Sequence, residues 1–348
     1  MSTYNIPTID FSDFSNRYAT VAEQIFDACK NIGFFHIINY ETPSILQVEQ
    51  AFDLSKQFFE LPTEEKIKFK QDSNQKKIEG YMEIYSQRFD PKNQKKGDFK
   101  ENFDMETLTD TKNIEHFPKL FQNHRSDLQA FSKGMHETAL RVLELLTFAL
   151  KLPPNDKTGA NDWLSSSHAY DGKGSTSVLR FLRYPNRTPE DEEDGSDNAD
   201  SEIILAGQHT DFIMITLLYQ NAPGLQVRVS DDSWLTVPVV NNAILVNLGG
   251  MFSYFTNGLF KSAMHRVIDM PDQRNRMDRY SIGYFVYPET GTMITNMPSP
   301  LIPCERPNFK EVPKDIKITT SNEYLDYRHQ RSLAAKQSSN TNGEYDVI

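Results

Sequence analysis

The sequence predicts a mainly β protein with flanking α-helices, in which a double-stranded β-helix, or jelly roll, follows an N-terminal helical region. Two observations indicate this fold class. Helical periodicity dominates before Pro153, whereas short apolar segments separated by turn residues fill the chain after it. Helices and strands do not alternate, and no glycine-rich phosphate loop occurs, so the sequence does not match a dinucleotide-binding α/β fold.

The first half of the chain predicts helices around a few short strands. Apolar residues at helical spacing end at Gly33, and the aromatic and β-branched residues 34–38 then predict a buried strand. Helical periodicity returns over 45–59, restarts at Thr63, and gives 117–152 the apolar stripe of a long helix. The polar segment 71–111 predicts long loops with short strands.

The second half predicts strands. Six short segments rich in β-branched and apolar residues lie at 177–184, 203–208, 213–219, 225–229, 234–237 and 243–248. We therefore expect an N-terminal helical region over 1–165, a jelly-roll domain over 166–300, a C-terminal extension with a helix over 301–336, and a disordered tail over 337–348.

The composition excludes several partners. A net charge of −11 argues against nucleic acid and anionic membranes, both of which need a basic surface. Much of this charge lies in the acidic segment 188–202, which predicts a solvated loop. Two distant cysteines indicate no disulfide, and no apolar segment reaches 18 residues. We expect a monomer in the cytoplasm, with the nucleus as a second location.

A candidate metal site begins with His209 and Asp211. Side chains two residues apart point the same way from a strand, so these two can converge on one ion. Such a short motif also occurs by chance, but His265 follows after several strands that fold back on one another. Two histidines and one carboxylate with open positions are expected for Fe(II) that activates O2, although a catalytic zinc also keeps an open position.

A candidate carboxylate site follows at Arg279 and Ser281, which share one face of a predicted strand. The planar guanidinium suits a carboxylate, and the serine hydroxyl adds a hydrogen bond. Apolar neighbours would bury this contact. A surface arginine is the alternative for Arg279 alone, but the three metal-ligand candidates make it the minor one.

The order of these motifs resembles the isopenicillin N synthase-like family of 2-oxoglutarate and Fe(II)-dependent oxygenases. The resemblance extends over nearly the whole chain, through IPTIDF, GFFHIINY, FFELPTEEK, LRFLRYP, GQHTDF, GLQV, VNLG, HRV and RYS. It implies that decarboxylation of 2-oxoglutarate to succinate is coupled, with O2, to oxidation of a small organic substrate, by hydroxylation above all.

The resemblance also implies residue roles. By position, the iron ligands are His209, Asp211 and His265, and the binders of 2-oxoglutarate are Arg279, Ser281 and Tyr184. Phe212, Phe285 and Arg180 are candidates for contact with the organic substrate. For the two phenylalanines, core packing is an equal alternative. For Arg180, the alternative is a salt bridge on the sheet surface.

Two departures from the family pattern occur. Leu182 replaces an asparagine common in plant members and resembles microbial members, and Gly249-Gly250 replaces a common Gly-Asp pair. Two other functions stay open at this point. One is an Fe(II) oxidase of the same fold without 2-oxoglutarate, against which Tyr184 argues, and the other is a binding protein without catalysis.

Overall fold

The computed structural model describes residues 5–72, 78–90, 94, 96–106, 108–109, 112–154, 160–171, 177–187, 203–230, 233–270, 277–294, 297–309 and 312–338. The predicted acidic loop 188–202 and residues 339–348 of the predicted tail lie outside the described residues.

The described strands form two sheets. The large sheet has the order β1 (Thr8–Asp10), β2 (Phe34–Ile38), β10 (Ile244–Leu248), β7 (Ile215–Gln220), β12 (Arg279–Val286), β5 (Val178–Tyr184), β4 (Glu101–Glu106) and β3 (Gly80–Met82). The small sheet has the order β6 (Ile203–His209), β11 (His265–Asp269), β8 (Leu225–Ser230) and β9 (Ser233–Thr236). Only β1 and β2 pair in parallel within the described sheets. All six predicted C-terminal strands are confirmed within two residues.

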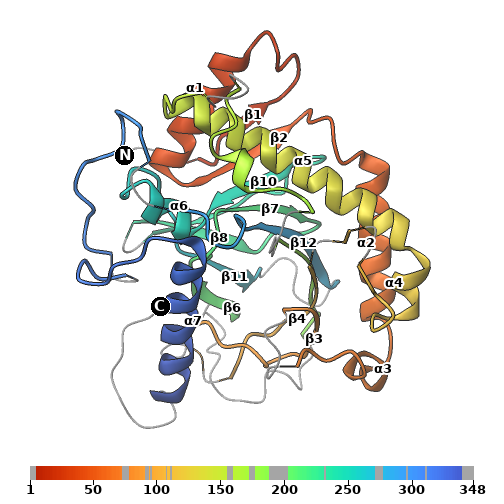
Figure 1. Ribbon diagram of the computed structural model, residues 1–348. Helices are drawn as coiled ribbons and strands as arrows, with labels where there is room; N and C mark the ends of the chain where they lie inside the picture. The colour runs from red at the N-terminus through yellow and green to blue at the C-terminus, as the bar shows by residue number, and fades with distance from the viewer. Residues whose placement is uncertain are drawn as a thin grey trace.

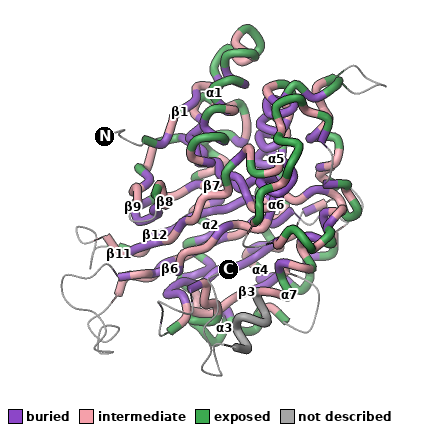
Figure 2. The backbone as a smooth tube through the Cα atoms, turned by 90° about the vertical axis from the view of Figure 1, so that its left-hand side faces the viewer, coloured by how far each residue is buried: buried purple, intermediate pink, exposed green. Residues whose placement is uncertain are grey.

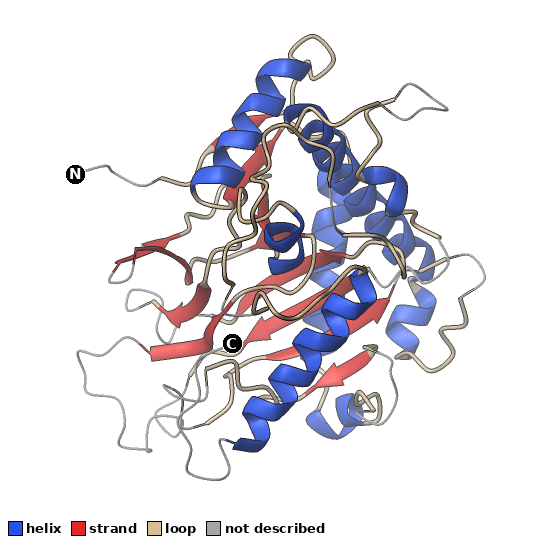
Figure 3. Ribbon diagram, turned by 60° about the vertical axis from the view of Figure 1, so that its left-hand side comes forward, coloured by secondary structure: helices blue, strands red, loops and turns tan. Residues whose placement is uncertain are grey.

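Helices cover the outer face of the large sheet (Figures 1 and 3). This layer contains α1 (Tyr18–Asn31), α2 (Ile45–Phe59), α4 (Lys119–Asn123) and α5 (Arg125–Ala149). The predicted helical segment 117–152 thus holds two helices, because the backbone leaves helical geometry at His124. The remaining helices are α3 (Thr63–Ile67), a 3-10 turn (Ser165–Ser167), α6 (Gly250–Phe255) and α7 (Ser321–Ser338), and α7 lies apart from the helical layer, below α6 in Figure 1.

Alternation along the strands divides the apolar residues into two cores. On β5, Leu179 and Phe181 point to the core beneath the helices, whereas Leu182 and Tyr184 point to the core between the two sheets. Figure 2 shows buried residues along the central strands. The inner core is the interior of the jelly roll. Residues of β5 that point to the same side as Leu182 therefore face the space between the two sheets.

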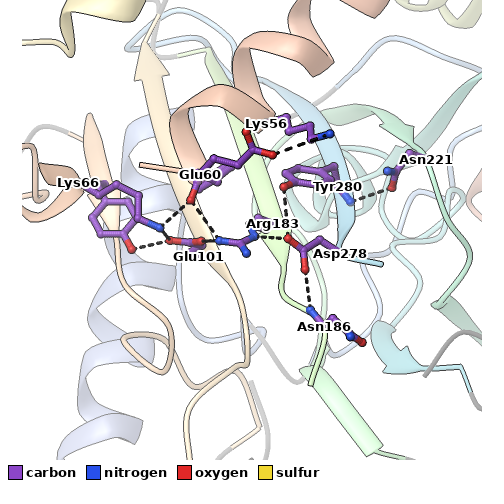
Figure 4. A network of polar contacts seen from close by, with 11 residues as sticks. Lys56, Glu60, Lys66, Glu101, Arg183, Asn186, Asn221, Asp278 and Tyr280 are labelled. Carbon is purple, nitrogen blue, oxygen red and sulfur yellow. Dashed lines mark hydrogen bonds and ion pairs between the residues drawn. The ribbon is translucent and has the colours of Figure 1, made fainter. Parts of the chain in front are cut away.

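A buried polar network joins the helical region to the large sheet (Figure 4). Glu101 accepts hydrogen bonds from Lys66 Nζ at 2.7 Å, the Tyr81 hydroxyl at 2.5 Å and Arg183 Nη1 at 2.8 Å. Arg183 also donates through Nε to Asp278 at 2.7 Å. Because Asp278 directly precedes β12, this network fixes the start of the strand that carries the predicted carboxylate site.

None of the helices in the described ranges has an apolar stretch of the length that a bilayer crossing requires.

Candidate active site

The structure brings the three predicted metal ligands together. His209 ends β6, His265 begins β11, and the two residues are direct cross-strand partners in the small sheet. Asp211 follows β6 by two residues, and its Oδ1 lies 4.0 Å from His209 Nε2 and 3.8 Å from His265 Nε2. Among the described residues, this is the one group of three or more such side chains whose ligand atoms lie within 4.8 Å of one another.

Hydrogen bonds orient both imidazoles toward the centre of this group. His209 Nδ1 donates to the Gly207 carbonyl at 2.8 Å, and His265 Nδ1 donates to the Ala263 carbonyl at 3.2 Å. Because a carbonyl only accepts, each Nδ1 carries a proton, and Nε2 is the nitrogen that faces the centre of the group. Burial, followed by the neighbouring imidazole of His265, lowers the pKa of His209 to about 3. His209 is therefore neutral, as a metal ligand must be.

The Asp211 carboxylate is held by one of its two oxygens. Its Oδ2 accepts from the Thr216 hydroxyl at 2.6 Å and from Asn247 Nδ2 at 2.7 Å. Burial alone would raise the pKa of Asp211, but the two imidazoles and these hydrogen bonds outweigh it and lower the pKa. Thr216 on β7 and Asn247 on β10 are cross-strand partners, so the sheet itself orients the carboxylate. Oδ1 is left facing the histidines.

This donor set fits Fe(II). Two imidazole nitrogens and one carboxylate oxygen are borderline and hard donors that occupy one side of an ion and leave coordination positions for small ligands. A structural zinc site would need a fourth protein ligand, and the described residues bring only these three together.

Arg279 lies buried in the inner core without an acidic partner. Its side chain is 7% exposed. Its polar contacts within the described chain are neutral: Gln220 Oε1 at 3.0 Å, the carbonyls of Pro223 and Ala222 at 3.2 and 3.3 Å, Ser281 Oγ at 3.5 Å, and the Tyr184 hydroxyl. A buried guanidinium is costly unless an anion pairs with it. The geometry therefore calls for an anionic ligand at this point.

Tyr184 and Ser281 complete the surroundings of Arg279. Tyr184 is its direct cross-strand partner, and the guanidinium carbon lies 4.9 Å from the centre of the Tyr184 ring. Burial raises the pKa of Tyr184 to about 12, against the opposing effect of Arg279, so the phenol stays protonated and able to donate. The three residues predicted to bind 2-oxoglutarate thus surround one point of the inner core.

Comparison with known proteins identifies the family. Residues 6–124 match the model of the non-haem dioxygenase in morphine synthesis N-terminal region, and residues 175–288 match the 2OG-Fe(II) oxygenase superfamily. A "2-oxoglutarate-Fe(II) type oxidoreductase" of Aspergillus fumigatus is 30% identical over 293 residues, 80% of this chain and 81% of the relative. The UPF0676 protein C1494.01 of Schizosaccharomyces pombe is 31% identical over 94% of this chain and 92% of its own length.

The chain belongs to the isopenicillin N synthase-like family of 2-oxoglutarate and Fe(II)-dependent oxygenases. It is accordingly an oxidoreductase that uses Fe(II), 2-oxoglutarate and O2, which confirms the predicted enzyme class and cofactors.

Solved structures confirm the jelly-roll fold of this oxygenase. A putative 2OG-Fe(II) oxygenase from Caulobacter crescentus superposes with a TM-score of 0.74 at 23% identity, covering 95% of this chain and all of that one. A full-length Neurospora crassa protein in complex with alpha-KG and thymine superposes with a TM-score of 0.74 at 22% identity, covering 95% of this chain and 97% of that one.

The structure places two of the three substrate candidates of the oxygenase side by side. The Arg180 guanidinium lies 4.7 Å from the centre of the Phe285 ring, and both residues share the strand face of the carboxylate site. Arg180 also forms a two-pronged ion pair with Asp104, with both contacts at 2.7 Å. Phe212 instead lies under Arg328 of α7, 4.2 Å from its guanidinium carbon, so its substrate role stays a prediction.

Several residues of the oxygenase site were not predicted from the sequence. The Phe89 ring stacks on His209 at 4.1 Å, and Lys100 Nζ lies 4.5 Å from the centre of the Phe89 ring. Burial lowers the pKa of Lys100 to about 8. Phe89 and Lys100 come from the polar segment 71–111, whose pattern carries no signal beyond loops and short strands. Asn247 lies inside the VNLG motif, which is the one signal that pointed to it.

Proposed function

We propose that His209, Asp211 and His265 hold the iron of this oxygenase, that Arg279 with Ser281 and Tyr184 binds the distal carboxylate of 2-oxoglutarate, and that the reaction hydroxylates a small organic substrate. The observation that carries the proposal is the buried Arg279, which has only neutral contacts in the described chain and lies in the same inner core as the three converging ligand atoms.

Each residue then has a defined task. The two imidazoles and Asp211 Oδ1 would hold the ion, while Thr216 and Asn247 keep the carboxylate in the orientation that exposes Oδ1. Iron held by these residues would supply, with 2-oxoglutarate and O2, the chemistry that oxidises a substrate C–H bond. The surrounding apolar residues of the inner core exclude water and strengthen the Arg279–carboxylate contact.

The proposed substrate contacts are Arg180 and Phe285. The Arg180–Asp104 pair presents both hydrogen-bond donors and acceptors, and Phe285 adds an aromatic surface beside it. We therefore propose a small substrate with a polar edge and a flat or apolar body. Arg180→Met should raise KM for the organic substrate and leave the affinity for 2-oxoglutarate unchanged.

An anaerobic titration of the protein with Fe(II) and 2-oxoglutarate tests the assignment. Binding is monitored by the visible absorption band of the complex, and turnover is then measured as succinate release after O2 is added. Arg279→Met should weaken 2-oxoglutarate binding by roughly 10- to 150-fold, since it removes a charge-assisted contact of about 1.5–3 kcal/mol. Arg266→Met is the matched control: Arg266 follows His265 on β11, but its side chain leaves the opposite face of the strand and stacks on Trp234 at 4.2 Å.

The two assignments fail separately. Wild-type affinity for 2-oxoglutarate in Arg279→Met would contradict the carboxylate site. Undiminished succinate formation in Asp211→Ala would contradict the metal ligands.

A further inference from the structure

A cavity borders the loop that carries the proposed metal ligands, which it contacts through Thr210. It has a volume of about 390 Å³ and is bounded by α6, α7 and the segments around Phe260 and Phe309. Its polar wall includes Arg328, Thr210 and Ser262, and its apolar wall includes Phe260, Phe309 and Val312. The volume falls in the range of small-molecule sites. None of the proposed iron or 2-oxoglutarate binders lines this cavity.

Arg328 is the exceptional side chain of this cavity. It is 1% exposed, and its Nε has no hydrogen-bond partner among the described residues. Nη1 donates to the Tyr324 hydroxyl at 2.7 Å, and Nη2 lies 3.5 Å from the Thr210 hydroxyl. No carboxylate of the described chain pairs with this guanidinium. A buried cation with neutral contacts alone is costly, so an anion in the adjoining cavity would stabilise it.

Gly250 lets Arg328 and Tyr324 pack closely against the start of α6. A Cβ atom at this position would lie 2.9 Å from Arg328 Nη1 and 2.6 Å from the Tyr324 hydroxyl oxygen. A larger residue there would therefore displace the guanidinium or the hydroxyl. A second buried polar atom without a partner, Ser262 Oγ, belongs to the same wall. Two buried polar groups without a partner in the described chain, Arg328 Nε and Ser262 Oγ, thus belong to residues that line this cavity.

We propose that this cavity is a binding site for a small organic acid, whose carboxylate pairs with Arg328 and whose apolar body contacts Phe260, Phe309 and Val312. The donors of the polar wall match a carboxylate, and the apolar wall matches an aromatic or aliphatic group of modest size. This site is additional to the iron centre and does not depend on the roles proposed above for Arg279 or the iron ligands.

The cavity shares one loop with the iron centre. Thr210, which faces Arg328, lies between the two proposed ligands His209 and Asp211, and the Gly250 amide donates to the Asp211 carbonyl at 2.7 Å. An acid bound to Arg328 therefore contacts the wall that holds the metal-ligand loop in place.

Calorimetric titration of the anaerobic Fe(II)·2-oxoglutarate enzyme with 3-phenylpropanoate tests the proposal without turnover. We expect saturable binding to the wild type. Arg328→Met should weaken it by about ten- to hundredfold, through loss of the cation. The control Arg331→Met, on the same helix and bonded to Tyr327 in a similar way, should bind like the wild type.

Three results would overturn the proposal. The first is the absence of saturable binding to the wild type. The second is equal binding of 3-phenylpropanamide, which has the same shape without the charge and needs no variant to fold. The third is binding that Arg180→Met abolishes and Arg328→Met leaves intact, since the probe would then occupy the pocket beside the iron.

Discussion

Replacing Thr216 by valine removes a single hydroxyl from the surroundings of Asp211 and keeps the shape of the side chain. The lost contact is short, 2.6 Å, and its acceptor is a carboxylate oxygen. Hydrogen bonds to charged groups contribute about 1.5–3 kcal/mol, and about 1.4 kcal/mol is a factor of ten. Because Asn247 still holds the same oxygen, we expect the lower part of this range, about a 10- to 30-fold weaker affinity for Fe(II).

The measurement is anaerobic equilibrium dialysis of the purified protein against Fe(II), with 2-oxoglutarate absent. Thr256→Val is the matched control, because Thr256 is also fully buried and donates to a backbone carbonyl, Phe252 O, at 2.9 Å. The Asn247→Leu/Thr216→Val double variant should lose more than the product of the two single losses, since the two donors share one oxygen. An Fe(II) affinity in Thr216→Val within twofold of the wild type would refute this reasoning.

Two further predictions concern stability. Glu101→Gln leaves Lys66 and Arg183 without their buried carboxylate and should lower the free energy of unfolding in urea by about 3–5 kcal/mol. The control Glu60→Gln removes an exposed ion pair and should change the free energy of unfolding little. Equal effects of the two variants would contradict the role of the network. Burial lowers the pKa of His168 to about 4, so the unfolded chain takes up this proton first as the pH falls. Stability should be complete above about pH 6.5 and decline toward pH 4, and His168→Gln should flatten that decline in thermal melts; an unchanged slope would argue against it.

Much of the fold was predictable because its signals are local. The strands of the second half alternate or consist of continuous apolar runs between turn residues, and such patterns are read within a few positions. The break between α4 and α5 was not predicted, because the apolar stripe of 117–152 continues past His124 while the backbone does not. Periodicity indicates which face of a helix is buried, but it does not indicate that a single residue has non-helical backbone dihedral angles.

The site was predictable where residue type and spacing carry the chemistry. His209, Asp211 and Arg279 are recognisable because each needs a specific side chain at an i, i+2 spacing on a strand. The partner of Arg180 was not, since Asp104 lies 76 residues earlier in a segment without a periodic pattern. The unpaired state of Arg328 was equally hidden, because burial without a counter-ion is a property of the assembled structure.

The order of strands in the large sheet also determines when the iron centre can form during synthesis. β2 pairs with β10, which is synthesised roughly 200 residues later, and β4 pairs with β5, which is also synthesised later in the chain. Because β10 carries Asn247, the nascent chain cannot form both hydrogen bonds that orient the Asp211 carboxylate until most of the chain has been made. The early aromatic strand β2 lacks its partner β10 for that interval, so we expect the nascent protein to depend on chaperones and to acquire iron only late in synthesis.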